Sequence, residues 1–244
     1  NGLLSLGYGS DKHIAETASR IKKAIFSNKV LQSYLFLNIP VLRPDAFINR
    51  TLPLVKRVFN KFTLLFLFVV ALSGYLSLLP KAERIGNVFW SSLSPEGLMG
   101  YMMALCLLKL VHEFSHAYVA KVNGVRVREM GIAMIVFIPR LYTNVTDAWR
   151  IPDRKMRCAI DSAGIVAEII IGGLFAILWC STPPGILNSI SYYFFSVSAI
   201  NTVFINGNPF IKYDGYYLLM DFVNIDNLQL RANELFRKKM RGSN

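Results

Sequence analysis

Cysteine is scarce in this chain of 244 residues. The three cysteines are Cys106, Cys158 and Cys180, and none of them belongs to a C-x-x-C pair. A disulfide framework is therefore not indicated. All three lie in or beside long apolar stretches, so they are expected to be small packing residues.

Charged residues are also few. They make up 17% of the chain against 53% hydrophobic residues, and the mean hydropathy is +0.39. This composition excludes an ordinary soluble domain and is typical of a membrane protein. Four apolar stretches are long enough to cross a bilayer as helices. These four predicted spans are residues 62–79, 98–120, 158–180 and 187–205.

Lysine and arginine are nearly absent from two connections between the predicted spans. Residues 80–97 hold two and residues 181–186 hold none, whereas residues 121–157 hold eight. Ten precede the first span and six lie in the tail from residue 206. The positive-inside rule then places both termini and residues 121–157 in the cytoplasm. The net charge of +12 is explained by topology and lipid contact, so no nucleic-acid partner is expected.

The N-terminal residues 1–61 lack an early apolar core, and no cleavable signal peptide is expected there. Within them, residues 14–27 fit a basic amphipathic helix on the membrane surface. No internal repeat or low-complexity tract is present. The expected location is an inner or plasma-type membrane, with the chain in contact with the lipid bilayer.

The second predicted span carries two of the three histidines, in the sequence His112-Glu113-Phe114-Ser115-His116. Ionisable groups at membrane depth are costly and point to a functional site. Residues four apart lie on one face of a helix, so His112 and His116 can bind one metal ion. Glu113 lies beside them, where it can act on a zinc-activated water.

A catalytic zinc usually takes three protein ligands. The remaining histidine, His13, is expected to be an isolated surface residue. The other candidates are carboxylates near the cytosolic membrane face, namely Asp147, Asp153, Asp161, Glu168, Asp214 and Asp221. Topology favours Asp214, because the second and fourth spans both run toward the cytosol and end at similar depth. Gly215 beside it allows close backbone approach.

Two segments outside the spans carry further signals. Residues 125–139 begin with alternating apolar and charged residues and continue as a run rich in β-branched residues. This pattern predicts one or two strands or a re-entrant segment. Their edge could receive an unwound substrate as an added strand, or they could form a packing hairpin. Residues 206–215 contain two glycines, two asparagines and a proline, and such a break is tolerated at membrane depth only where it lines a cavity or is buried. Residues 80–97 are expected to be an outer loop.

The H-E-F-S-H motif within a span, followed by N-G-N-P-F-I-K-Y-D-G at residues 206–215, resembles the site-2 protease family of intramembrane zinc metalloproteases. Asn206, Pro209 and Asp214-Gly215 fit the spacing of the family's second motif, and Ala163-Gly164 matches its small-residue pair. The amino-acid sequence from residue 208 onward is more similar to the peptide zinc metalloprotease branch of this family. That branch accompanies export systems with membrane-fusion adaptors. The resemblance covers roughly residues 98–232.

The resemblance implies an all-α polytopic membrane protein with about four transmembrane helices, a short β segment between the second and third, and a site-2 protease-like core. The domain organisation expected from it is a cytosolic or membrane-surface segment (1–61), a first transmembrane helix with an outer loop (62–97), the catalytic core (98–223) and a cytosolic amphipathic helix (224–244).

The resemblance also implies roles for individual residues. Zn²⁺ would be held by His112, His116 and Asp214, with Glu113 as the general base. Asn206 is a candidate catalytic residue that orients substrate or stabilises the oxyanion, or it is only a helix-end cap. The candidate substrate-binding residues are Glu168 and Asn208. Many members of the family carry an asparagine at the position of Glu168. Glu168 could therefore be hydrogen-bonded inside the helical bundle and make no contact with substrate.

The predicted function is hydrolysis of a peptide bond in a membrane-associated or exported peptide. The alternative is a non-proteolytic zinc-binding subunit of a peptide export complex, with a membrane-fusion adaptor or an ABC-type exporter as partner. A small-solute transporter is disfavoured, because the chain lacks repeated halves with paired broken helices.

Overall fold

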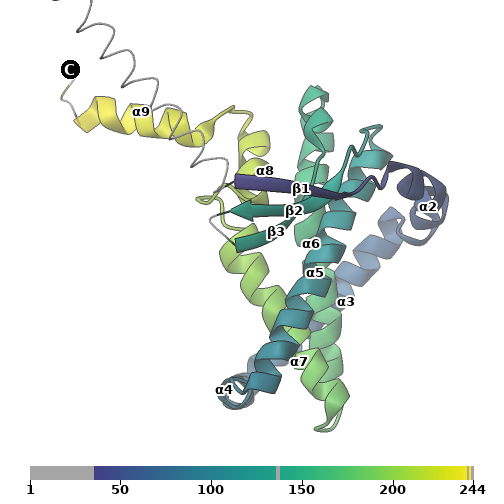
Figure 1. The fold of residues 1–244 in the computed structure, drawn as a ribbon. Helices are drawn as coiled ribbons and strands as arrows, with labels where there is room; N and C mark the ends of the chain where they lie inside the picture. Colours follow the sequence, from purple (N-terminus) through teal and green to yellow (C-terminus); the bar gives the residue numbers. More distant parts are fainter. Residues whose placement is uncertain (1–35, 136–137, 241, 243–244) are drawn as a thin grey trace, which may run out of the picture. The chain divides into compact units, whose positions relative to one another are not determined.

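The computed structural model describes residues 36–135, 138–240 and 242, and the chain divides into two compact units (Figure 1). The first unit takes in the described residues up to Val41 together with Gly131–Tyr142. The second takes in Leu42–Met130 and the chain from Thr143 onward. His13 and the amphipathic helix predicted for residues 14–27 lie outside the described residues.

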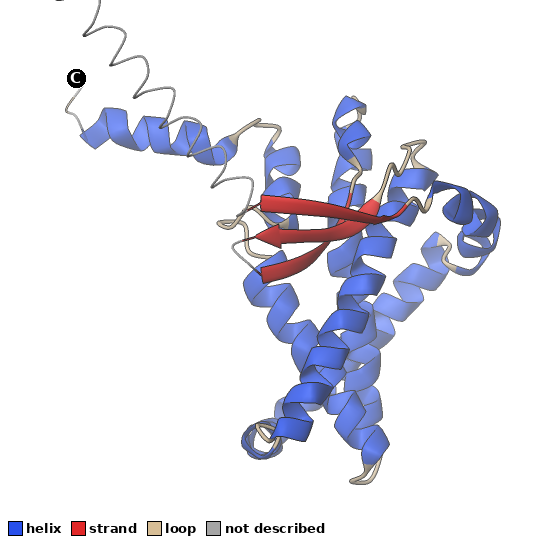
Figure 2. Cartoon of the chain, viewed as in Figure 1, coloured by secondary structure: helices blue, strands red, loops and turns tan. Residues whose placement is uncertain are grey.

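The first unit is built on a three-stranded sheet, red in Figure 2. Its strands are β1 (Phe36–Leu42), β2 (Met130–Ile135) and β3 (Ile138–Thr143), in the order β1-β2-β3. Pro40 lies in β1, and a proline is tolerated there because β1 is an edge strand. Gly131 lets β1 and β2 approach closely, since a Cβ on it would lie 2.1 Å from the carbonyl oxygen of Ile39.

The sheet corrects one expectation. The strand β1 was not predicted, because residues 1–61 were expected only to form a cytosolic or membrane-surface segment. The segment 125–139 supplies β2, which is the central strand and is paired on both sides. The same predicted segment also includes Ile138 and Pro139 of β3, which is an edge strand, so strand addition at this sheet stays a prediction.

The second unit is helical. Its helices are α2 (Asp45–Val58), α3 (Lys61–Leu78), α4 (Ala82–Ser91), α5 (Pro95–Val122), α6 (Arg154–Ser181), α7 (Ile186–Ile200), α8 (Asp214–Val223) and α9 (Leu228–Met240). Short 3-10 turns form at Leu79–Lys81 and Thr146–Arg150, and a π-helical segment forms at Asn201–Asn206.

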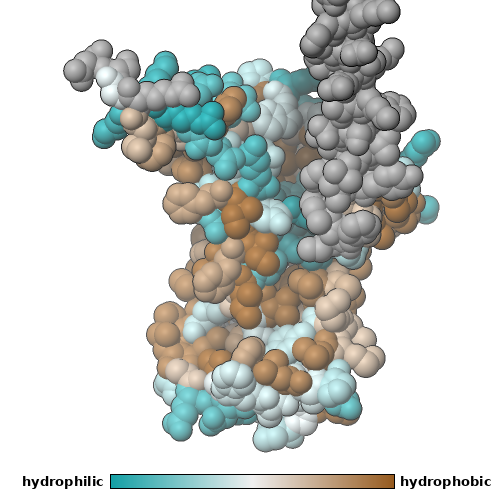
Figure 3. Space-filling model, turned by 60° about the vertical axis from the view of Figure 1, so that its left-hand side comes forward, coloured by the Kyte–Doolittle hydropathy of each residue, from teal (hydrophilic) through white to brown (hydrophobic). Residues whose placement is uncertain are grey.

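Three helical stretches among the described residues are long and apolar enough to cross a membrane: Lys61–Ser91, Pro95–Val122 and Arg154–Ser181. They contain the first three predicted spans. On the face drawn in Figure 3, apolar side chains gather in a brown band at the height of these helices. The fourth predicted span, 187–205, corresponds to the 15 residues of α7 and the six π-helical residues that follow directly.

Helix α4 is a second correction to the predicted topology. Residues 80–97 were expected to form a loop, but the turn Leu79–Lys81 continues the helical path from α3 and α4 follows at once. Trp90 lies on this helix and is exposed.

Helix α6 holds the second unit together, because it packs against α3, α5, α7 and α8. Its contact with α3 depends on small residues: a Cβ on Gly74 would lie 2.1 Å from the carbonyl oxygen of Gly173. Small residues of this kind allow membrane helices to approach closely. The contact of α6 with α5 and α8 is the one that positions the site described next.

Candidate metal centre

The motif residues on α5 face the interior of the helical unit. His112, Glu113 and His116 are 1%, 7% and 8% exposed. The two imidazoles lie one helical turn apart, and their Nε2 atoms are 3.1 Å from each other. Nothing in the apolar composition of α5 accounts for two buried imidazoles on one face, which leaves a shared ligand as the explanation.

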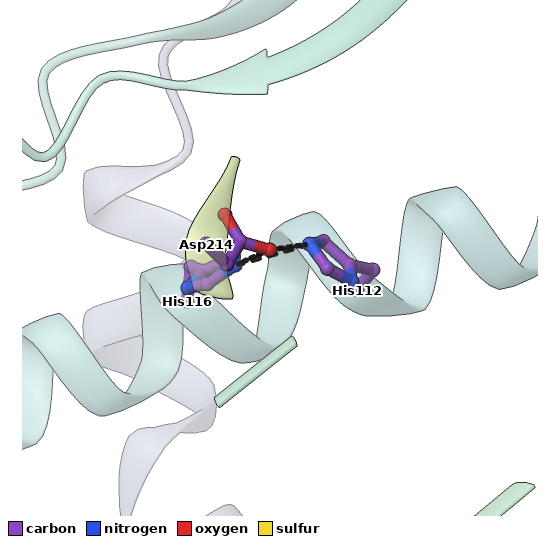
Figure 4. Close-up of side chains that lie close together, drawn as sticks. All are labelled: His112, His116 and Asp214. Atoms are coloured by element: carbon purple, nitrogen blue, oxygen red, sulfur yellow. Dashed lines mark hydrogen bonds and ion pairs between the residues drawn. The ribbon is translucent and has the colours of Figure 1, made fainter. Parts of the chain in front are cut away.

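Asp214 is the first residue of α8 and follows directly on the broken segment. Its Oδ2 lies 2.8 Å from Nε2 of His112 and 3.4 Å from Nε2 of His116. Figure 4 shows the three side chains pointing toward one another. Gly215 permits this placement, because a Cβ there would lie 2.6 Å from the backbone of Gly207.

The three side chains fit a metal ion. Each offers one ligand atom, and these atoms all lie within 4.8 Å of one another. Oδ2 of Asp214 is buried and, among the described residues, has no hydrogen-bond partner of good geometry despite its short distance to His112. An oxygen atom in this position is better suited to bind a cation than to accept a hydrogen bond from an N–H group. The Nδ1 atom of His116 lies 2.7 Å from the carbonyl oxygen of Ile160, an arrangement usual for a ligating histidine.

Other carboxylates considered from the sequence have different partners. Asp147 accepts two hydrogen bonds from the guanidinium of Arg128, which holds the pKa of Asp147 below its usual range. Asp153 caps the start of α6, and Asp221 pairs with Arg157 at 3.0 Å. The last of them, Asp161, is half-buried on α6.

Glu113 is buried beside the two histidines, and its carboxylate has no hydrogen bond or ion pair with any described residue. Its backbone carbonyl accepts a hydrogen bond from Thr143 Oγ1 at 3.1 Å. The carboxylate is thus not committed to a structural contact in the part of the chain that the structure describes.

The remaining predicted site residues fall into two places. Asn206 is fully buried at the end of the π-helical segment, and its Nδ2 donates to Oε1 of Glu168 at 3.0 Å. Glu168 is 1% exposed and lies on the opposite side of His112 from Asp214. Asn208 is separate from both: its Oδ1 accepts from the backbone N–H of Phe210, which is a local turn contact.

Two further residues contribute to the site, one of which, Gly164, belongs to the small-residue pair noted in the sequence. Gly164 leaves room for the imidazole of His112, because a Cβ on Gly164 would lie 2.4 Å from Cε1 of His112. Lys109, whose role was not predicted from the sequence, lies 3.4 Å from Glu168. The signal that could have found this pair is the presence of one lysine and one glutamate in two adjacent apolar spans, since each needs a partner at that depth.

Comparison with known proteins agrees with this reading. The model of peptidase family M50 matches residues 100–212, which include the histidine motif and end just before Asp214. The predicted resemblance to the site-2 protease family is confirmed over these residues. Members of this family are membrane-embedded metalloproteases that depend on zinc.

A curated relative adds no activity to this assignment. An uncharacterized protein of Methanocaldococcus jannaschii is 35% identical over 71 residues, which are 29% of this chain. The match spans about a fifth of that relative's length. No solved structure matches the chain.

Proposed function

We propose that this chain is a zinc endopeptidase that hydrolyses a peptide bond of a membrane-associated or exported peptide near the cytosolic face of the membrane. The observation that carries the proposal is the convergence of His112, His116 and Asp214 from two helices onto one point. Two imidazoles and one carboxylate are a ligand set typical of catalytic zinc in hydrolases.

The chemistry follows from the residues around that point. Zinc held there would supply a Lewis acid that activates water near neutral pH. Glu113 is the general base: its carboxylate takes a proton from the attacking water and returns it to the leaving amine. The products are one carboxylate and one amine, so water is the sole co-reactant.

Two amides are proposed for the substrate side. Asn206 remains a candidate to orient substrate or stabilise the oxyanion, although its amide is occupied by Glu168 and Lys109 in this structure. Asn208 lies in the broken segment before α8 and is less buried. Because Oδ1 of Asn208 already accepts a hydrogen bond from Phe210, a substrate contact would use its Nδ2, which lies 3.4 Å from the carbonyl oxygen of Phe204.

The substitution Glu113→Gln tests the proposal. It keeps the size of the side chain but removes the base, so cleavage should fall by at least about 100-fold while zinc is retained. Mass spectrometry of membrane-associated peptides in cells carrying Glu113→Gln, compared with wild type, should find uncleaved peptides that accumulate. His112→Ala should accumulate the same peptides and also lose zinc.

The alternative is a non-proteolytic zinc-binding subunit of an export complex, with a membrane-fusion adaptor or an ABC-type exporter as the partner. It predicts a different pattern. Export and peptide lengths would be normal in Glu113→Gln, whereas export alone would be disturbed in His112→Ala, because only the latter removes the metal. That pattern would rule out the proteolytic role.

A further inference from the structure

The back of the ligand His112 faces a buried carboxylate. Glu168 on α6 is 1% exposed, and its Oε1 lies 2.9 Å from Nδ1 of His112. The opposite ring nitrogen, Nε2, lies 2.8 Å from Oδ2 of Asp214. The two nitrogens of one ring therefore face two different carboxylates.

The position of Glu168 determines which nitrogen carries the proton. A carboxylate at Nδ1 accepts the Nδ1–H and leaves the Nε2 lone pair directed at the ligand point. The amide Nδ2 of Asn206 also lies near Nδ1, at 3.3 Å. The carboxylate is closer and charged, so it is the acceptor for that proton.

The carboxylate of Glu168 is itself held by several donors. Oε1 accepts from Nδ2 of Asn201 at 2.7 Å and from Nδ2 of Asn206 at 3.0 Å, and Oε2 accepts from Oγ1 of Thr202 at 2.9 Å. All three donors lie in the π-helical segment Asn201–Asn206. The hydrogen bond from Gly207 N to Thr202 O spans five residues, as in a π-helix, and widens this turn relative to an α-helix. The wider turn directs the three donors toward α6.

A lysine supplies the opposite charge. Nζ of Lys109 lies 3.4 Å from Oε1 of Glu168 and donates to Oδ1 of Asn206 at 3.1 Å. A buried charge is tolerated when it is paired and its remaining lone pairs are satisfied. Glu168 meets both conditions, so it can remain a carboxylate in an apolar span.

We propose that Glu168 is the positioning residue of the metal site. It holds the ring of His112 with Nε2 toward Asp214, and Lys109 and the segment Asn201–Asn206 hold Glu168 for that task. The inference rests on the proposed function in one respect, namely that a metal binds where His112, His116 and Asp214 meet. It departs from the prediction that Glu168 contacts substrate.

Zinc affinity distinguishes positioning from a purely structural ion pair. The full chain in detergent micelles would be titrated with zinc against a chelator. Glu168→Ala should bind zinc about 10- to 100-fold more weakly, which is the usual effect of removing a partner of a ligating histidine. Glu168→Gln should lose less zinc affinity than Glu168→Ala, but at least about threefold. A neutral amide is a weaker acceptor than a carboxylate and can present its NH₂ group to the ring.

Asp45→Asn is the matched control, because Asp45 is also paired with a lysine of α5, at 2.6 Å. It should leave zinc affinity unchanged. Zinc affinity of folded Glu168→Ala within twofold of wild type would overturn the proposal. Should Glu168→Ala fail to fold, Glu168→Gln decides, and affinity equal to wild type would overturn it equally.

The protonated nitrogen can be observed directly, because the chain has three histidines. In zinc-loaded protein with ¹⁵N-labelled histidine, the Nδ1–H of His112 should carry the signature of a strong hydrogen bond, and Glu168→Ala should weaken it. His116 should not change, because its Nδ1 faces the carbonyl oxygen of Ile160. A spectrum of His112 that is the same in Glu168→Ala and wild type would contradict the proposal.

These readouts need no cleavage, so the two proposals can fail separately. Glu113→Gln should bind zinc as wild type does. If Glu113→Gln also cleaves normally, the proteolytic function is wrong, whereas the loss of zinc affinity in Glu168→Ala would still support positioning. If zinc affinity is unaffected at Glu168 while Glu113→Gln abolishes cleavage, only the positioning role is wrong.

Discussion

Helix α5 carries two lysines that pair with carboxylates, and the surroundings of the two pairs differ. Lys121, near the C-terminal end of α5, lies 2.6 Å from Asp45, whose side chain is 28% exposed. Lys109, one turn before the histidines, lies 3.4 Å from Glu168, whose side chain is 1% exposed. The shorter ion pair is thus the one with more access to solvent.

The difference shows that the length of an ion pair does not measure its importance. Asp45 has three donors, namely Lys121, the backbone N–H of Val127 at 3.2 Å and Nδ2 of Asn49 at 3.5 Å, and water can replace a lost one. Glu168 is out of reach of water, so every donor that it loses leaves an unsatisfied charge. What matters is the state of the carboxylate after its partner is removed.

The largest expected effect comes from removing the two lysines in turn. Lys109→Met leaves Glu168 buried without a counter-charge and should lower the free energy of unfolding by about 3–5 kcal/mol. Lys121→Met leaves Asp45 near solvent and should cost about 1 kcal/mol or less. Chemical unfolding of the full chain in mixed micelles, followed by circular dichroism, measures both. Equal losses would show that the two pairs are equivalent.

A double variant sharpens this result. Lys109→Met combined with Glu168→Gln removes both charges, so its loss of stability should be smaller than that of Lys109→Met alone. If the two losses add, Lys109 stabilises the protein through contacts other than Glu168.

The sequence predicted the elements that carry the metal site better than the contacts that support it. The H-E-x-x-H spacing and the depth of Asp214 depend on helical periodicity and topology, which a sequence displays directly. The contacts of Glu168 join residues 33 to 59 positions apart, and no periodicity encodes such pairs. A single π turn at Asn201–Asn206 changes which side chains face α6, and nothing in that sequence separates it from an α-helix.

The errors in the predicted fold have similar causes. Residues 80–97 were expected to be a loop because they are polar beside an apolar span, yet ten of them form the amphipathic helix α4. No strand was predicted around Pro40, although an edge strand tolerates a proline because it does not need every N–H. Strand order depends on long-range pairing, so the central position of β2 could not be predicted from its own residues.

An intermediate effect is expected from a change that touches no charge. Gly164→Ala places a Cβ 2.4 Å from Cε1 of His112, so the ring or α6 must shift. Overpacking of this kind costs about 1–3 kcal/mol, and zinc affinity should fall because Nε2 leaves its position. Gly86→Ala is the control, since a Cβ there meets nothing within 4 Å. Unchanged zinc affinity in Gly164→Ala would mean that the position of His112 is not critical.

The smallest effect is expected at the exposed pair, and it should depend on pH. The hydrogen bond from Lys121 lowers the pKa of Asp45 below 3.8, against an opposing contribution from burial. A folded-state pKa below the unfolded one adds stability above the unfolded value, and that stability is lost as pH falls through the folded value. Asp45→Asn should therefore cost about 1 kcal/mol at pH 7.

That difference between Asp45→Asn and wild type should shrink as the pH falls below about 4. Unfolding of both proteins in micelles at several pH values measures it. A difference that stays constant with pH would mean that Asp45→Asn acts through the packing of its amide group, because only the contribution of the charge is lost on protonation.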